Sequence, residues 1–254
     1  MTPPDLISAA EDTRALADLN QWLGAQSAEQ RIAWALASLP GEHALSSSFG
    51  AQSAAILHLV TRERNDVPVI LIDTGYLFPE TYRFADQMTE RLGLNLKVYR
   101  PTIGIAWMEA RFGRLWEQGV DGIERYNRLR KVEPMRRALD ELGARTWIAG
   151  LRRSQTEQRR GIDFLELRDE RWKFHPLADW GDRDVWNYLQ SNNLPYHPLW
   201  ERGYISIGDV HTTQPWEPGM REEDWPTTPE GIAALLAHMD QSEPLEMATD
   251  EEAD

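Results

Sequence analysis

The sequence predicts an α/β protein with a doubly wound, mainly parallel sheet flanked by helices. Short apolar segments at 43–46, 67–72, 95–99 and 146–149 alternate with stretches of helical period. The unbroken apolar run at 67–72 is typical of a strand buried on both faces of a parallel sheet. Polar or glycine-containing motifs follow three of these segments. In such sheets ligands bind beyond the carboxyl ends of the strands, so these motifs are the candidate sites.

Helices are expected between and before these strands. Residues 5–39 carry apolar residues at helix-like spacing and are stopped by a Pro-Gly pair. The same pattern predicts helices at 51–64, 79–92, 103–118 and 133–143. From about residue 176 the chain is rich in Pro, Gly and aromatics, which indicates a loop-rich but ordered C-terminal extension. Within and after it we expect helices near 185–189 and at 229–239.

This organisation predicts an N-terminal helical segment at 1–40, an α/β domain at 41–225 and an acidic tail at 226–254, partly disordered. Residues 240–254 hold seven Asp and Glu and no Lys or Arg, within a chain of net charge −14. An acidic chain argues against non-specific nucleic-acid binding. No apolar run reaches 18 residues and no secretory signal is evident, so we expect a cytoplasmic protein with no membrane contact.

The sequence contains no cysteine. Disulfides, thiolate zinc sites, iron–sulfur clusters bound by cysteine and a thiol nucleophile from this sequence are therefore excluded. His175, His197 and His211 fit no standard ligand spacing, so we expect packed or hydrogen-bonded histidines and no metal site.

The stretch at 44–57 is the most informative. An apolar segment runs into Ser46, Ser47 and Ser48, then Phe49 and Gly50, and a helical pattern follows. A strand, a small-residue loop and a helix start can aim backbone N–H groups and hydroxyls at one phosphate or other oxyanion. The alternative is an ordinary serine helix cap.

Two further motifs follow strands. In Asp73–Thr74–Gly75, the aspartate could bind a ribose hydroxyl or a metal and the glycine could let a ligand approach the backbone; the alternative is a simple Asx-turn. The segment from Gly150 places Arg152, Arg153, Gln155 and Arg159 close together, which favours phosphate or sulfate binding over a solvated basic face. A second basic cluster, around Lys131, lies at a helix start and could equally be an exposed loop. These candidate positions are Asp73, Thr74, Gly75, Lys131, Gly150, Arg152, Arg153, Gln155 and Arg159.

Together these segments resemble the 3′-phosphoadenylylsulfate (PAPS) reductase family, which has an adenine nucleotide α-hydrolase-like, PP-loop-related fold. The resemblance covers roughly residues 15–224. The matching motifs are Leu45–Gly50, Asp73–Tyr82, Leu115–Gly119, Lys131–Pro134, Gly150–Arg153, Tyr196–Trp200, Ile207–Asp209 and His211–Thr213.

The resemblance implies thioredoxin-dependent reduction of PAPS to sulfite and adenosine 3′,5′-bisphosphate in sulfate assimilation, through a cysteine that becomes S-sulfonated. It implies that the Ser46–Gly50 loop holds the phosphosulfate and that Asp73 and Gly75 lie near the nucleotide. Lys131 and the Arg152–Arg159 group would neutralise the sulfate and the 3′-phosphate. Related adenylylsulfate reductases carry paired cysteines for an iron–sulfur cluster where this chain has Tyr126–Arg130, so no cluster is expected.

The family's C-terminal cysteine motif is missing: the segment Gly219–Gly231 contains no cysteine, and the chain then diverges into its acidic end. A hydroxyl is a far weaker nucleophile toward sulfur and cannot undergo thiol exchange. We therefore predict a PAPS-binding or adenosine 3′,5′-bisphosphate-binding protein with an accessory or regulatory role, or one that uses a thiol from a partner or thioredoxin. A homodimer is possible. The alternatives are an enzyme of different chemistry on ATP or PAPS and an interaction module without ligand.

Overall fold

The computed structural model describes residues 6–155 and 159–215 and confirms the α/β class. Six strands form one sheet in the order β3-β2-β1-β4-β6-β5, parallel except for β5, which is antiparallel to β6. The strands are β1 (Glu42–Ser46), β2 (Pro68–Ile72), β3 (Asn95–Tyr99), β4 (Ala144–Ala149), β5 (Leu165–Arg168) and β6 (Arg171–Phe174). The strand order reverses between β1 and β4, which is where such sheets bind ligands.

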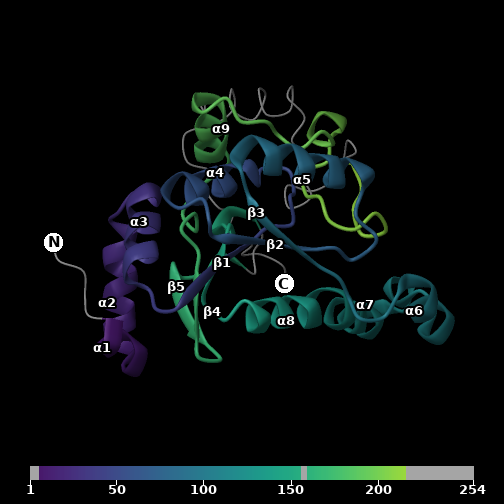
Figure 1. Cartoon of the computed structure of the whole chain (residues 1–254), viewed down its shortest axis with the longest axis horizontal. Helices are drawn as coiled ribbons and strands as arrows, with labels where there is room; N and C mark the ends of the chain where they lie inside the picture. The colour runs from purple at the N-terminus through teal and green to yellow at the C-terminus, as the bar shows by residue number, and fades with distance from the viewer. Residues whose placement is uncertain (1–5, 156–158, 216–254) are drawn as a thin grey trace, which may run out of the picture.

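Helices lie on both faces of the sheet and at its two ends (Figure 1). One face carries α3 (Ala28–Ser38), α4 (Ala54–Glu63), α5 (Pro79–Leu92) and α9 (Asp182–Ser191). The other face carries α8 (Glu133–Glu141). At one end lie α1 (Leu6–Glu11) and α2 (Thr13–Gly24), and at the other lie α6 (Ile105–Phe112) and α7 (Gly119–Asn127).

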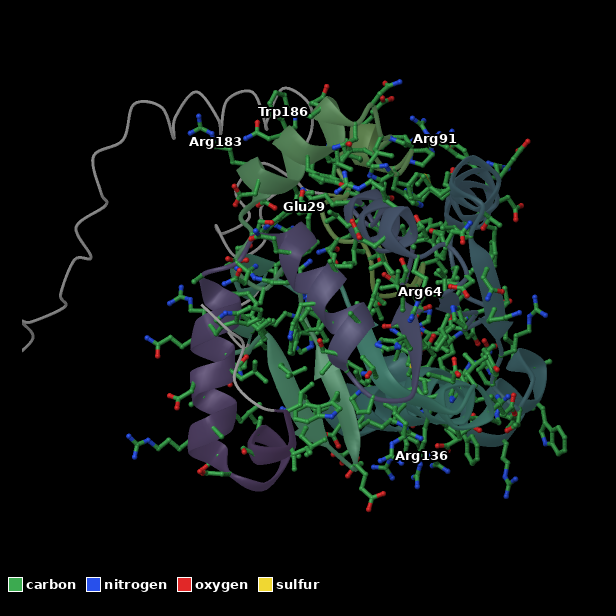
Figure 2. The ribbon with its side chains drawn as sticks, turned by 60° about the vertical axis from the view of Figure 1, so that its left-hand side comes forward. Glu29, Arg64, Arg91, Arg136, Arg183 and Trp186 are labelled. Carbon is green, nitrogen blue, oxygen red and sulfur yellow. The ribbon has the colours of Figure 1, made fainter. Side chains whose placement is uncertain are left out.

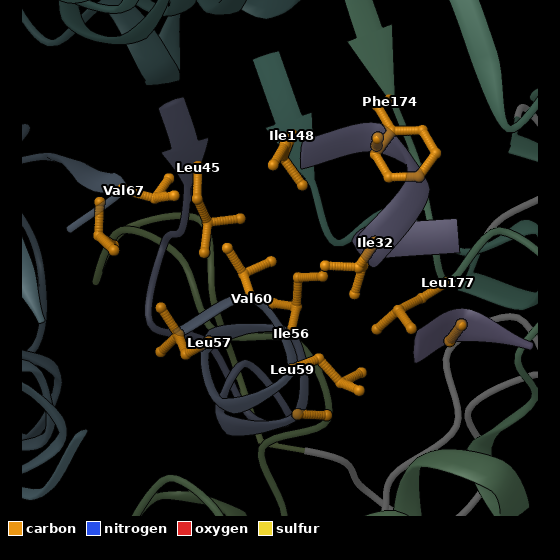
Figure 3. Packing of buried hydrophobic residues seen from close by; sticks show 14 of the residues in the cluster. Ile32, Leu45, Ile56, Leu57, Leu59, Val60, Val67, Ile148, Phe174 and Leu177 are labelled. Carbon is orange, nitrogen blue, oxygen red and sulfur yellow. The ribbon is translucent and has the colours of Figure 1, made fainter. Parts of the chain in front are cut away.

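The main core lies around α4 (Figure 3). Ile56, Leu57 and Val60 are buried there with Leu45 of β1 and Ile148 of β4. Each such side chain contributes about 1.5–3 kcal/mol on burial. This packing fixes the start of α4 beneath the carboxyl ends of β1 and β4.

A smaller core lies under α8 on the opposite face. Ala138 and Leu139 of that helix pack against Ala44 of β1 and Ile70 of β2. Beyond α8 this face of β4 and β6 stays partly open, which leaves room for a site. No helix within the described ranges is both long and apolar enough to cross a membrane.

The expected helix at 103–118 is wrong in its second half. Helix α6 ends at Phe112 because Gly113 adopts φ 71°, a conformation that breaks an α-helix. A 3₁₀ turn at Leu115–Glu117 and then α7 follow. The stretch at 5–39 likewise divides into three helices, because Ser27 and Gln30 form a capping box that starts α3 anew.

The sequence reasoning missed the β5–β6 hairpin. Its two strands have four residues each, and its turn uses Asp169 and Glu170 at positive φ where glycine or asparagine is usual. Helix α2 protects the edge of β5, because the Asn20 side chain bonds both the N–H and the C=O of Leu165. The expected helix at 229–239 and the tail at 226–254 lie outside the described residues.

Candidate functional site

A large cleft opens at the carboxyl ends of β1 and β4 and continues over the open face of β4 and β6. Its volume is about 2460 Å³. Eleven of the fourteen predicted site residues line it, although they come from four separate segments. They are Ser46, Ser47, Ser48, Gly50, Thr74, Lys131, Gly150, Arg152, Arg153, Gln155 and Arg159.

The serine loop between β1 and α4 is held from below and presents its amides to the cleft. The Ser47 N–H donates to Ile70 O at 3.0 Å, and Phe49, buried at φ 50°, donates its N–H to Ser47 Oγ at 3.1 Å. The cap residue of α4 is Ser53, whose side chain makes no capping bond.

Four amides of this loop remain for a ligand. Within the described residues they donate no hydrogen bond, and all four residues line the cleft: Ser48, Gly50, Ala51 and Gln52. Successive N–H groups of this kind form a concave anion-binding surface. A Cβ at Gly50 would lie 3.4 Å from both Ile207 O and the Ser48 hydroxyl, which is an ordinary contact distance, so the steric surroundings of the described residues do not by themselves require glycine there.

The Gly150–Gln155 loop supplies positive charge on the other side. Arg152 is 5% exposed, and its guanidinium donates to Asp182 at 3.0 Å and to the Gln52 side chain. Its own N–H donates to Gln155 Oε1 at 3.1 Å, and Arg159 donates to the same oxygen at 2.5 Å. The loop is therefore ordered around Gln155 and brings two arginines together.

Lys131 reaches the cleft from a π-helical turn at Arg128–Val132 between α7 and α8. Its Nζ lies 2.8 Å from Asp209, which is 1% exposed. Asp209 also accepts hydrogen bonds from the Thr74 hydroxyl and, at 3.0 Å, from Tyr126. One buried carboxylate thus ties Lys131 to the turn after β2.

Two cations near the cleft are held in surroundings unfavourable to positive charge. Burial lowers the pKa of Arg159, and the nearby charge of Arg152 lowers it further. Burial is also the main cause that lowers the pKa of Lys173, whose Nζ lies 4.8 Å from the Trp147 ring centroid. A bound anion would relieve both effects, so the cleft is electrostatically suited to one.

Three predicted residues do not line the cleft: Phe49, Asp73 and Gly75. Asp73 is 6% exposed and accepts hydrogen bonds from Tyr82 at 2.6 Å, Arg100 at 2.7 Å and the Gly75 N–H at 2.9 Å. The bond from the Gly75 N–H forms the Asx-turn that the sequence offered as the alternative. The turn places Thr74 in the lining of the cleft.

The histidines are engaged in packing. The N–H of Leu199 donates to His197 Nδ1, so Nε2 carries the proton and donates to Thr81. Burial lowers the pKa of His197 to about 4. His211 stacks on Trp116 with ring centroids 3.9 Å apart. Over the described part of the chain, no group of three or more His, Cys, Asp or Glu residues could hold a metal ion.

Among the polar cleft residues that the sequence did not predict, three pair with predicted ones: Gln52, Asp182 and Asp209. Gln52 lies within the helical pattern assigned to 51–64 and gave no separate signal. Asp209 belonged to a recognised motif, Ile207–Asp209, but its partner Lys131 is 78 positions earlier in the sequence. Such pairings become visible only after folding.

Residues 42–215 match the family model described as phosphoadenosine phosphosulfate reductase domain. A curated protein from Xanthomonas oryzae pv. oryzae, named phosphoadenosine 5′-phosphosulfate reductase, is 66% identical over 217 residues, covering 85% of this chain and 89% of its own. A protein of the same name from Xylella fastidiosa is 65% identical over 209 residues, covering 82% of this chain and 88% of its own.

The chain is also similar to solved structures, one of them from the same family. The crystal structure of PAPS reductase from Candida auris, a phosphate complex, has a TM-score of 0.70 and 29% identity, covering 80% of this chain and 98% of that chain. FMN adenylyltransferase from Candida glabrata has a TM-score of 0.53 at 15% identity, covering 84% and 79%. The second likeness shows a shared fold only.

Proposed function

Because the chain belongs to the phosphoadenosine phosphosulfate reductase family, we propose that its cleft binds PAPS or adenosine 3′,5′-bisphosphate. The observation that carries this proposal is the arrangement at the cleft's mouth. Four loop amides without a partner in the described residues lie in the same cleft as Lys131 and Arg152. Amides, a lysine and an arginine are the groups that bind phosphate and sulfate oxygens best.

We assign the anionic groups of the nucleotide to the serine loop and to the basic side chains of the cleft. The Ser46–Gly50 loop takes the phosphosulfate, or the 5′-phosphate of the product. Lys131, Arg152, Arg153, Gln155 and Arg159 neutralise the sulfate and the 3′-phosphate. The phosphate complex of the Candida auris relative supports an anion site in this fold, since that protein was crystallised with phosphate.

The chemistry after binding differs from that of the family. The sequence contains no cysteine, so no thiolate from it can attack the sulfate sulfur. We infer that this chain binds the nucleotide without forming an S-sulfo intermediate. Its role is then accessory or regulatory, or a protein partner other than thioredoxin supplies the thiol.

Isothermal titration calorimetry with adenosine 3′,5′-bisphosphate tests the binding. We expect about one nucleotide bound per chain, with much weaker binding of AMP, which lacks the 3′-phosphate. ATP serves as a second comparison, since preference for ATP would favour adenylyl chemistry instead. No heat at millimolar adenosine 3′,5′-bisphosphate would contradict the proposal.

A sulfite assay tests the missing chemistry. With PAPS and reduced thioredoxin as the sole protein partner, we expect no sulfite above the protein-free control. A family member that carries the cysteine motif serves as positive control. Sulfite release by this chain with thioredoxin alone would show that the proposal of an absent nucleophile is wrong.

A further inference from the structure

The cleft is larger than a nucleotide needs. Sites for small molecules typically enclose roughly 300–1,000 Å³, whereas this one measures about 2460 Å³. The surplus lies over the open face of β4 and β6, where Trp147 and Lys173 are paired neighbours on adjacent strands. We call this part the basic groove.

The basic groove is lined mainly by cations. They come from α8, from the β5–β6 hairpin and from the segment before it: Arg136, Arg160, Arg168, Arg171 and Lys173. Two of these cations are already paired, Arg171 with Asp140 and Arg168 with Glu166, and Asp169 also lines the cleft. Arg136 is exposed and forms no ion pair with any described residue; Figure 2 shows it at the end of the molecule opposite Trp186. Over the whole cleft, nine Lys and Arg residues face four Asp residues.

The sequence itself supplies an oppositely charged segment. Twelve of the 41 Asp and Glu residues lie in 216–254, but one of the 27 Lys and Arg residues does. Seven of those carboxylates lie in 240–254, the acidic segment, which has no Lys or Arg. The chain's negative charge is therefore concentrated in one part of the sequence, and the cleft's positive charge in another.

The chain leaves the described region at the cleft. Thr212, Thr213 and Gln214 line it, and Thr213 is held there because the Gly208 N–H donates to its hydroxyl at 3.0 Å. The acidic segment begins 25 residues after Pro215. An extended chain of that length spans up to roughly 80 Å, so its reach does not limit contact with the basic groove.

We propose that the acidic segment 240–254 binds in the basic groove of its own chain and competes with the nucleotide for the cleft. This rests on the proposed nucleotide site, which shares Arg159 and the adjoining loop with the groove. Carboxylates bound in the groove would neutralise the positive potential that a 3′-phosphate or sulfate needs for binding. Because the attraction is between largely exposed charges, salt should weaken it steeply.

Distances between two spin labels test the docking directly, and the cysteine-free sequence allows each label to be placed without background. The test protein carries Val132→Cys and Thr249→Cys. Val132 lines the cleft and is 58% exposed. The matched control carries Val98→Cys with Thr249→Cys, since Val98 is 43% exposed on β3, away from the cleft.

We expect the Val132 pair to show a short, narrow distance population at low salt. This population should disappear in 1 M salt, where the Debye length is about 3 Å. The Val98 pair should show a broad distribution at both salt concentrations. Equally broad distributions for both pairs would overturn the proposal. Loss of the short distance on dilution with unlabelled protein would also overturn it, because it would place the segment on a second copy.

Calorimetry with adenosine 3′,5′-bisphosphate tests the competition. One variant neutralises six carboxylates of the acidic segment: Asp240→Asn, Glu243→Gln, Glu246→Gln, Asp250→Asn, Glu251→Gln and Glu252→Gln. The control neutralises six exposed carboxylates on helices away from the cleft: Asp18→Asn, Glu63→Gln, Asp86→Asn, Glu90→Gln, Asp121→Asn and Glu124→Gln. Both change the net charge equally.

If the segment occupies the cleft about nine-tenths of the time, its neutralisation raises nucleotide affinity about tenfold. The control should change affinity less than about threefold at the same ionic strength. Equal affinities of the two variants would overturn the competition. If neither variant nor the parent binds nucleotide, the proposed function fails, while the label distances still decide whether the segment docks.

Discussion

The turn at Asp73–Gly75 and the loop at Gly150–Gln155 occupy equivalent positions in the sheet topology, but their charged side chains have different roles. Each follows a buried parallel strand, β2 or β4, at the same edge of the sheet. The charged side chain of the first, Asp73, is turned away from the cleft and bonded to Arg100 and Tyr82. The charged side chain of the second, Arg152, lines the cleft.

The difference teaches that position in the topology is not sufficient to identify a binding residue. A charged residue at a strand end lies near the cleft, but its neighbours determine whether its side chain forms an ion pair away from the cleft. Arg100 follows β3 beside β2 and captures Asp73 at 2.7 Å. Within residues 6–155 and 159–215, the side chains that pair with the Arg152 guanidinium all line the cleft themselves: Gln52, Ser154 and Asp182.

The substitution Arg152→Ala tests this difference most strongly, because it removes the charged side chain that lines the cleft. Hydrogen bonds to charged groups contribute about 1.5–3 kcal/mol each, so affinity for adenosine 3′,5′-bisphosphate should fall about tenfold to hundredfold. Titration calorimetry measures it. Arg83→Ala, on the exposed side of α5, is the matched control and should bind as the parent does. Unchanged affinity of Arg152→Ala would remove the loop from the site.

Asp73→Asn should give the converse result. The asparagine side chain can still accept hydrogen bonds, but it lacks the negative charge to which Arg100 and Tyr82 donate. The free energy of unfolding should therefore fall by about 1–2 kcal/mol. Nucleotide affinity should stay within about twofold, or about 0.4 kcal/mol, because Asp73 does not line the cleft. Urea unfolding and calorimetry on the same sample measure both. A tenfold loss of affinity with normal stability would place Asp73 in the site instead.

The two glycines sharpen the comparison at the backbone. Gly75 has φ 81°, and a Cβ there would lie 2.6 Å from Ile105. Gly75→Ala should therefore cost about 1 kcal/mol or more in unfolding free energy. At Gly150 a Cβ would lie 2.9 Å from Ile56 Cγ2 and 3.2 Å from Ile56 Cβ, so Ile56 must shift, but the backbone there has no positive φ that an alanine would strain. Denaturant midpoints should rank Gly75→Ala below Gly150→Ala; the reverse order would contradict the turn geometry.

The smallest expected effect is on acid stability. Burial alone would raise the pKa of Asp73, but hydrogen bonds from Tyr82, Arg100 and Gly75 lower it overall below 3.8. A carboxylate whose pKa is lower in the folded chain than in the unfolded chain stabilises the fold at pH above its unfolded-state pKa. This stabilisation is lost as the pH falls through the folded-state pKa. Between pH 5 and 2, Asp73→Asn should lose less additional stability than the parent, by under about 1 kcal/mol because Arg100 is exposed to solvent. Parallel unfolding curves over that range would contradict this.

Much of the fold could be predicted because its signals are local. The apolar runs that form β1 to β4 and the helix starts after them can be recognised within ten to fifteen residues. The break at Gly113 could not, because a single glycine inside a helical pattern is compatible with either continuation or an end. The β5–β6 hairpin was missed because charged residues in its strands and Asp169–Glu170 in its turn hide the usual pattern.

The candidate site divides in the same way. The serine loop and the arginine segment were found because each concentrates its chemistry in a few consecutive residues. Asp209 and Asp182 were not, because their value depends on Lys131 and Arg152, which are brought beside them by the sheet. Local sequence thus identifies groups that line the cleft, whereas the groups that orient them emerge from long-range packing.

The most direct test of the central claim is a crystal structure of the intact chain with adenosine 3′,5′-bisphosphate. We predict the nucleotide in the cleft, with one phosphate against the amides of the serine loop and the other within hydrogen-bond distance of Lys131 or the Arg152–Arg159 group. A cleft without nucleotide at saturating concentration, or a nucleotide bound elsewhere on the chain, would contradict the account.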